Sequence, residues 1–340
     1  MIREWLGNVA EKKCDPEGEK IEMAKLYIIG NGFDIAHRMK TSYWDFKKWL
    51  AEQEDSAPKS LLWVLSNLES YCNVENFWSS LELSLGHMDI RSYLKEIMGE
   101  HQITDINDEH YGELGEAWEA VYAQLITIDA EMGLDVISDI FADWIRHIKP
   151  ASAQEPQYQK LSGQDLYLSF NYTNTLEELY AIPSSQVLHI HGLASDEESI
   201  LVFGHGHMYD LDKCDTIGEE VMGIDAEGVA RMYGTALNNL HKDTESIFSQ
   251  NQGWFDNLPN SGITDIVALG FSFGEVDDKY FHEINRRLPN VQWNFSIYTK
   301  NEETRRIDIE RANDFIKRVG INPKSCCGFD SEEPNISIKI

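Results

Sequence analysis

The segment KLYIIGNGFD, residues 25–34, constrains the fold more than any other part of the chain. Its apolar run stops abruptly at Gly30-Asn31-Gly32, which predicts a buried strand that enters a tight turn. The residues that follow have helical spacing. A strand, a glycine turn and a helix in this order bring backbone N–H groups to a phosphate in many α/β folds. Only the first G-x-G of the dinucleotide fingerprint is present, so the turn is either a plain structural turn or a ligand loop.

The composition is that of a globular protein with a strong acidic bias. The 340 residues are 42% hydrophobic, and their formal net charge is −29. Binding of nucleic acid irrespective of its sequence requires a positive surface, so this charge argues against a broad DNA- or RNA-binding face. It argues against anionic membranes as partners for the same reason.

The cysteines and the apolar runs bear on location. The five cysteines are scattered and form no CxxC pair, so neither a disulfide framework nor a zinc module is indicated. The beginning of the chain has no apolar core of a signal peptide, and no apolar run approaches the ~18 residues of a membrane span. We therefore expect a cytoplasmic protein.

Strand and helix patterns alternate along the chain. We expect a polar leader at 1–23 and one α/β domain at 24–340, with a helical insertion or cap at about 58–148. Further strands are expected near 165–171, 187–191, 200–206, 264–269 and 291–299, and a last helix at 302–320. The alternation predicts an α/β fold with a doubly wound, mainly parallel, Rossmann-like sheet and one large helical excursion.

Polar or glycine clusters stand at the carboxyl ends of four expected strands. These clusters are Gly30 to Gly32, Asn171 to Thr173, His191 and Gly270 to Ser272. In open α/β sheets, ligands bind in the crevice outside these strand ends. Polar turns are common at strand ends, but four ends with these residue types favour a ligand site.

Three narrower readings of these residues were open. A zinc site from His189, His191, His205 and His207 lacks a familiar partner spacing, and a histidine at a strand end suits general acid–base work better. GFSFG has the form of a hydrolase nucleophile elbow, but only His282 follows it, inside the next expected helix. Asp277 either caps that helix or contacts a ribose.

Six segments together resemble the AbiH family of bacteriophage abortive infection proteins. They are LYIIGNGFD (26–34), TSYWDF (41–46), FWSSLE (77–82), FNYTNTLE (170–177), HIHG (189–192) and GFSFGEVDDKYF (270–281). The resemblance spans about residues 25–285, in the same order as in the family.

AbiH-like proteins are in turn similar to sirtuin-type domains, which include NAD-consuming defence effectors. This resemblance implies catalytic roles for Asn171 and His191. It implies nucleotide contacts for Gly30, Asn31, Gly32, Phe33, Asp34, Thr173, Gly192, Gly270, Ser272 and Asp277. Asn31 replaces an alanine of the pattern and Thr173 replaces an aspartate, while the missing CxxC pairs disfavour deacetylation.

The resemblance implies a phage-defence protein that hydrolyses or binds NAD or a related nucleotide, without a further required cofactor or metal. The alternative is a non-catalytic nucleotide sensor, for NAD or ADP-ribose, that controls a partner. A toxic nuclease is disfavoured by the charge of −29. The expected partners are the nucleotide, further copies of the chain and a phage trigger or partner protein.

Overall fold

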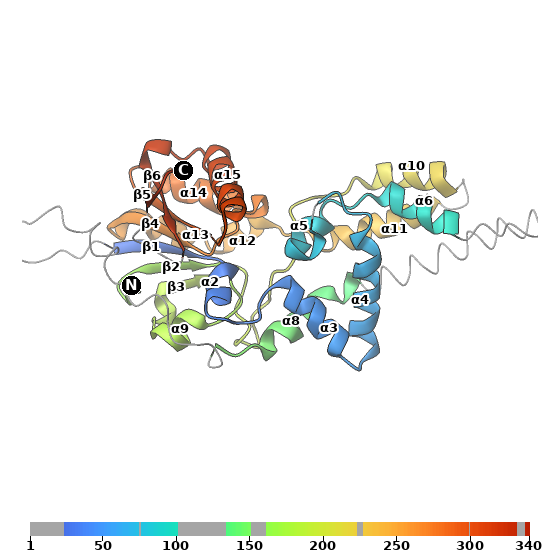
Figure 1. Ribbon diagram of the computed structural model, residues 1–340, viewed down its shortest axis with the longest axis horizontal. Coiled ribbons are helices and arrows are strands. Elements are labelled where there is room, and N and C mark those ends of the chain that lie inside the picture. Colours follow the sequence, from blue (N-terminus) through green and yellow to red (C-terminus); the bar gives the residue numbers. More distant parts are fainter. Residues whose placement is uncertain are drawn as a thin grey trace, which may run out of the picture. The chain divides into compact units, whose positions relative to one another are not determined.

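The computed structural model describes residues 24–74, 76–100, 134–150, 161–222, 227–298, 300–331 and 337–340. The chain divides into two compact units (Figure 1). The first lies within Met1–Thr41, Ile145–Leu201 and Asp243–Ile340, and the second within Ser42–Trp144 and Val202–Lys242. The expected leader at 1–23 lies outside the described residues.

The first unit is built on one sheet of seven strands. In chain order they are β1 (Ala24–Ile29), β2 (Leu166–Ser169), β3 (Val187–His189), β4 (Ile263–Leu269), β5 (Gln292–Ile297), β6 (Cys326–Asp330) and β7 (Ser337–Ile338). Their order across the sheet is β3-β2-β1-β4-β5-β6-β7, and only the β6–β7 pair is antiparallel. This confirms the predicted mainly parallel, Rossmann-like α/β sheet.

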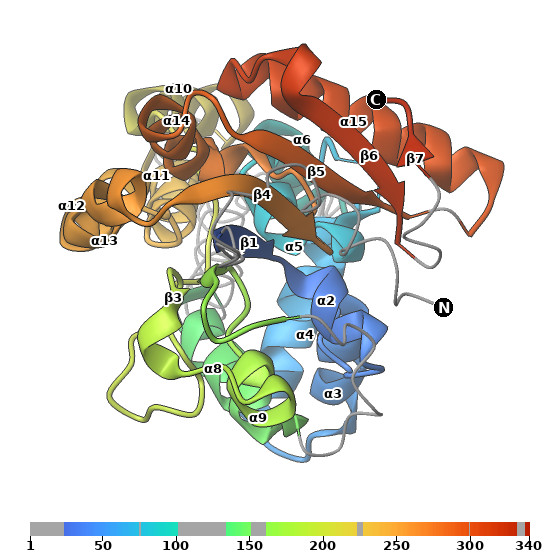
Figure 2. The ribbon, with the colours of Figure 1, turned by 90° about the vertical axis from the view of Figure 1, so that its left-hand side faces the viewer.

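Both faces of the sheet are covered by helices, as the doubly wound prediction requires (Figure 2). Successive side chains of a strand point to opposite faces. Leu26 and Ile28 of β1 accordingly join a core with α12 (Thr244–Gln250), α13 (Gln252–Asn257), α14 (Asp278–Arg287) and α15 (Glu302–Val319). Tyr27 and Ile29 join the opposite core with α2 (Asn31–Ala36) and α9 (Thr175–Tyr180).

The strand order reverses direction between β1 and β4. From β1 the chain builds outward to β2 and β3 on one side, and β4, β5 and β6 extend the other side. Such a switch point is where ligands bind in this class of fold. The turn Gly30 to Gly32 follows β1, and the turn Gly270 to Ser272 follows β4. Both turns therefore lie at the switch point.

The structure corrects the strand prediction in two places. Residues 200–206 form no strand; His205 makes only an isolated bridge to His241. Gly204 has a φ of +150° and lies against the backbone of Leu240, which interrupts an extended run. The sequence pattern also missed β6 and β7, because CCGFD is short and contains a glycine.

The second unit is helical in its described residues. Its helices are α3 (Tyr43–Glu52), α4 (Ser56–Glu69), α5 (Leu81–Leu85), α6 (Ile90–Glu100), α10 (Leu211–Met222) and α11 (Glu227–Asn238), together with most of α8 (Ile137–His147). The expected insertion was 58–148, whereas this unit begins at Ser42 and includes 202–242. A half-buried carboxylate links these segments.

Glu82 is that carboxylate. Its Oε1 accepts a hydrogen bond from the N–H of Gly204 at 2.7 Å and lies 3.3 Å from Nζ of Lys242. Its Oε2 accepts from the hydroxyl of Tyr43 at 2.9 Å. The three donors satisfy the half-buried negative charge of Glu82. Removal of one donor would lower the stability of the fold, because the charge would lose a partner that water cannot fully replace. Segments from three parts of the sequence are joined through one side chain.

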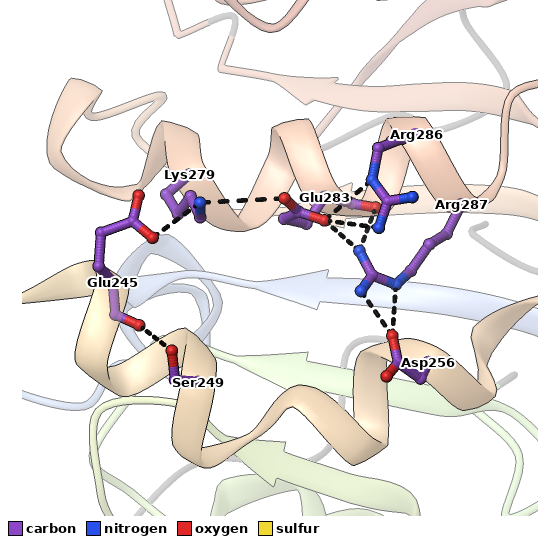
Figure 3. Close-up of polar contacts among 7 residues, drawn as sticks. All are labelled: Glu245, Ser249, Asp256, Lys279, Glu283, Arg286 and Arg287. Carbon is purple, nitrogen blue, oxygen red and sulfur yellow. Dashed lines mark hydrogen bonds and ion pairs between the residues drawn. The ribbon is translucent and has the colours of Figure 1, made fainter.

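Ion pairs join α12 and α13 to α14 in the first unit (Figure 3). Lys279 lies 2.8 Å from Glu245, and Arg287 lies 2.6 Å from Asp256. Both cations also lie within 5.5 Å of the ring centroid of Phe248. Exposed ion pairs contribute little, so burial of Phe248 under the two cations is the larger stabilising effect. The arrangement fixes α14, the helix that begins directly after Asp277.

Candidate functional site

The two glycine turns contact each other directly at the switch point. The N–H of Gly32 donates to the carbonyl of Gly270 at 2.9 Å, and the N–H of Gly30 donates to that of Leu269 at 3.0 Å. A Cβ on Gly270 would lie 2.2 Å from the nitrogen of Phe33, and Gly270 has a φ of +61°. Close backbone approach and a left-handed conformation both require glycine here.

This contact bears on the expected phosphate loop. The N–H groups of Gly30, Gly32 and Phe33 all donate to backbone carbonyls, of Leu269, Gly270 and Gly30 respectively. These three N–H groups are therefore already used in hydrogen bonds within the protein, as expected of a purely structural turn. The pyrophosphate role of the turn stays a prediction.

Asn31 and Phe33 have separate environments. Asn31 is exposed, and its Nδ2 donates to the carbonyl of Thr41 at 2.8 Å. The ring of Phe33 is completely buried beside His37 and Tyr180, in the core under β1. Asn31 closes the loop after α2, and Phe33 packs as a core residue.

Asp34 is the most buried carboxylate of the region, with 1% of its surface exposed. It accepts hydrogen bonds from the hydroxyls of Thr173 at 2.6 Å and Thr175 at 2.8 Å. Burial raises the pKa of Asp34 to about 6, although these hydrogen bonds lower it in part. Thr173, which replaces the aspartate of the family pattern, therefore holds an aspartate from another segment.

We expect Asp34→Asn to remove a pH dependence of stability. The folded protein binds the Asp34 proton more tightly than the unfolded chain does. The free energy of unfolding of the native protein should therefore fall as pH rises from about 4 to about 6, by about 3 kcal/mol from this group, and then stay level. Urea unfolding of both proteins between pH 4 and 7.5 measures it.

The control for this measurement is Glu178→Gln, an exposed carboxylate on α9. The stability difference between native protein and Asp34→Asn should change across this pH range, while that for Glu178→Gln should not. A difference for Asp34→Asn that stays constant from pH 4 to 7.5 contradicts the assignment.

Asn171 follows β2 and is 5% exposed. Its Nδ2 donates to the carbonyl of Gly30 at 3.0 Å, which settles the orientation of the amide because only the nitrogen can donate. Its Oδ1 is buried and has no hydrogen-bond partner among the described residues. Buried polar atoms are nearly always satisfied, so an acceptor of this kind indicates a missing donor.

His191 and Asp277 form a buried pair. His191 is 3% exposed, and its Nε2 lies 3.3 Å from Oδ1 of Asp277, an ion-pair distance without a hydrogen bond between these two atoms. Phe170 packs edge-on to the imidazole with 5.3 Å between ring centroids, and the ring of Tyr280 lies 6.2 Å away. Catalytic hydrogen bonds often align only when substrate is bound. The pair can act as a base with an adjacent carboxylate.

The hydroxyl oxygen of Tyr280, like Oδ1 of Asn171, is a buried polar atom without a hydrogen-bond partner among the described residues. Burial raises the pKa of this hydroxyl, so the phenol is neutral. Tyr280 lies in the first turn of α14, directly after Asp277. Sequence reasoning missed it, although its spacing from Asp277 would place both on one side of a helix start.

The remaining candidates are spread around this site. Gly192 has a φ of +90°, and a Cβ there would lie 2.4 Å from the carbonyl oxygen of Ile200, so the glycine is required by the turn. Ser272 is exposed in the turn after β4, and His282 is exposed in α14. The structure thus brings His191 and Asp277 together, joins the side chain of Asn171 to Gly30, and links Asp34 with Thr173 instead of exposing either.

Neither a metal cluster nor a membrane helix is found in the part of the chain that the structure describes. No three His, Cys, Asp or Glu side chains within the described ranges gather as a metal site requires. No helix built from those residues is long and apolar enough to cross a bilayer.

Comparisons with known proteins place the chain in a family. Residues 26–297 match the family model described as "Bacteriophage abortive infection AbiH", a range that contains all the candidate residues named above. Searches of curated proteins and of solved structures gave no match. The similarity to sirtuin-type domains is therefore kept as a hypothesis. Because the family model covers most of the sequence, the chain belongs to the AbiH family of bacteriophage abortive infection proteins.

Proposed function

We propose that this AbiH protein hydrolyses NAD or a related nucleotide at the nicotinamide–ribose bond. The observation that carries the proposal is the buried pair of His191 and Asp277, with Nε2 and Oδ1 3.3 Å apart. Asn171 adds a buried Oδ1 that has no hydrogen-bond partner among the described residues. The three side chains follow three different strands at the carboxyl edge of a parallel sheet, where such folds bind their ligands.

The chemistry needs a base and an oriented nucleophile. In the proposed step His191 takes a proton from water while the water oxygen attacks the anomeric carbon of the ribose. The carbon–nitrogen bond breaks, and nicotinamide leaves as a neutral molecule with the bonding electrons. Asp277 stabilises the imidazolium that forms, as carboxylates do beside catalytic histidines. Asn171 accepts a hydrogen bond from the water or from a ribose hydroxyl through Oδ1.

In this proposal Asp277 also supplies the negative charge that the aspartate of the family pattern would provide and that Thr173 cannot. The nicotinamide ring of NAD is cationic until its bond to the ribose breaks, and a threonine supplies no negative charge near it. The carboxylate of Asp277 comes from the turn after β4, so the charge is available from a different strand end. The proposal therefore concerns the ribose–nicotinamide end of the ligand and does not depend on the engaged N–H groups of Gly30, Gly32 and Phe33.

The test is incubation of the purified full-length chain with NAD, alone and with extract of phage-infected cells, with nicotinamide measured by chromatography. We expect nicotinamide release, and a decrease of about tenfold or more in Asn171→Ala because an oriented hydrogen bond in the transition state is lost. Absence of release under both conditions removes the proposal.

The lack of a hydrogen bond between Nε2 of His191 and Oδ1 of Asp277 favours one alternative, a sensor that binds the nucleotide without turnover. Calorimetry with ADP-ribose distinguishes the two functions. Saturable binding, together with NAD recovered intact after incubation, supports the sensor.

A further inference from the structure

We propose that His189 and Glu177 form a positioning pair that holds Asn171 for its role in the site. Both residues act through Asn171 in this proposal, and neither is proposed to contact the nucleotide. The inference rests on the proposed function only for its effect on turnover, because the geometry of the pair stands by itself.

His189 is held between two acceptors. Its Nδ1 lies 3.2 Å from the backbone carbonyl oxygen of Asn171, and its Nε2 lies 3.0 Å from Oε1 of Glu177. The side chains of His189 and Glu177 are 9% and 15% exposed. A carbonyl and a carboxylate can only accept, so a proton on the facing ring nitrogen makes each contact a hydrogen bond. The backbone of Asn171 and the side chain of Glu177 therefore hold the ring from two sides.

Asn171 is held at three of its polar atoms. Its backbone N–H lies 3.2 Å from Oγ of Ser169, its Nδ2 donates to Gly30, and its carbonyl accepts from His189. Only Oδ1 has no hydrogen-bond partner among the described residues. Catalytic groups act best when their supporting contacts leave one orientation. The contacts with Ser169, Gly30 and His189 together fix the orientation of Asn171 and leave Oδ1 able to accept a hydrogen bond from a ligand.

The pair comes from two elements that both follow Asn171 in the chain. His189 ends β3, which pairs with β2 directly before Asn171, and Glu177 lies in the first turn of α9, directly after the NYTNT segment. The H-x-H pattern thus has two uses. His191 lies with Asp277, and His189 supports the neighbouring asparagine.

Two substitutions at one position separate the two contacts of His189. In His189→Asn the side-chain nitrogen occupies the place of Nδ1, so the donor to Asn171 is kept and the contact with Glu177 is lost. In His189→Gln the nitrogen occupies the place of Nε2, so the contact with Glu177 is kept and the donor to Asn171 is lost. Glu177→Gln is the second test, because it keeps the shape of the side chain and removes its charge.

We expect His189→Asn to retain nicotinamide release within about threefold of the native protein, and His189→Gln to lose about tenfold or more in kcat with little change in KM. Glu177→Gln should fall between them. Hydrogen exchange of peptides that cover 166–176, measured by mass spectrometry, should be faster in His189→Gln than in His189→Asn.

The exchange measurement does not require NAD turnover. If the native protein releases no nicotinamide, the proposed function fails, and the exchange contrast still decides whether His189 holds Asn171. Equal exchange in His189→Asn and His189→Gln overturns the positioning pair, and so does equal loss of kcat in both when the native protein is active.

Discussion

Replacement of His191 by glutamine should lower nicotinamide release from NAD by about 10²- to 10⁴-fold, the usual contribution of a positioned general base. Glutamine retains a side-chain amide of similar reach but cannot take a proton from water at neutral pH. His191 is almost fully buried among aromatic rings, so no other described histidine replaces it from solvent. The rate is measured by chromatography of the released nicotinamide.

The matched control is His282→Gln, since His282 is an exposed histidine on α14 close in sequence to Asp277. It should leave the rate unchanged. Binding of ADP-ribose to His191→Gln, measured by calorimetry, should persist, because the proposed role of His191 is proton transfer. An active native protein whose rate is the same in His191→Gln as in His282→Gln excludes His191 as the base.

Replacement of Gly270 by alanine should destabilise the first unit by about 4 kcal/mol or more, or prevent its folding. The new Cβ would meet the nitrogen of Phe33 at 2.2 Å and the carbonyl carbon of Gly32 at 2.4 Å. These are backbone atoms, which cannot move aside without disrupting the end of β1. The left-handed φ of +61° adds about 1–2 kcal/mol for any residue with a Cβ.

Gly274 is the matched control because it lies in the same GFSFG turn. Its φ is −62°, and nothing lies within 4 Å of a Cβ built on it. Gly274→Ala should therefore be neutral or stabilising by about 0.4–1 kcal/mol. The two variants are compared by soluble yield and by urea unfolding. Equal stability of Gly270→Ala and Gly274→Ala contradicts the contact between the two turns.

The parallel sheet was predictable because short sequence patterns identify its central strands β1 and β4. The apolar runs before Gly30 and Gly270 contain β-branched residues and end in glycines, and each is followed by a helix pattern. The strand β6 carries no such mark, because CCGFD has neither alternation nor a continuous apolar run. Residues 200–206 carried the apolar mark, but the conformation of Gly204 depends on Leu240, which no local pattern reveals.

The candidate site was predictable to the level of strand ends. Asn171, His191 and Asp277 each follow a strand, and parallel strands bring such ends together. The partner of Thr173 was not predictable, because Asp34 lies in a segment nearly 140 residues earlier in the chain. The extent of the second unit depended likewise on Glu82 and its bond to Gly204. Contacts of single side chains across long sequence separations leave no periodic pattern.

The pairing of β1 with β4 has a consequence for synthesis of the chain. Ile29 and Leu269 are register partners about 240 residues apart, which a ribosome translating about 5–20 residues per second separates by roughly 12 to 48 seconds. During that time the apolar strand β1 has left the ribosome without its neighbour on one side. The unpaired edge and apolar side chains of β1 are the kind of surface that chaperones bind, and synonymous codons that slow translation between the two strands would lengthen its exposure.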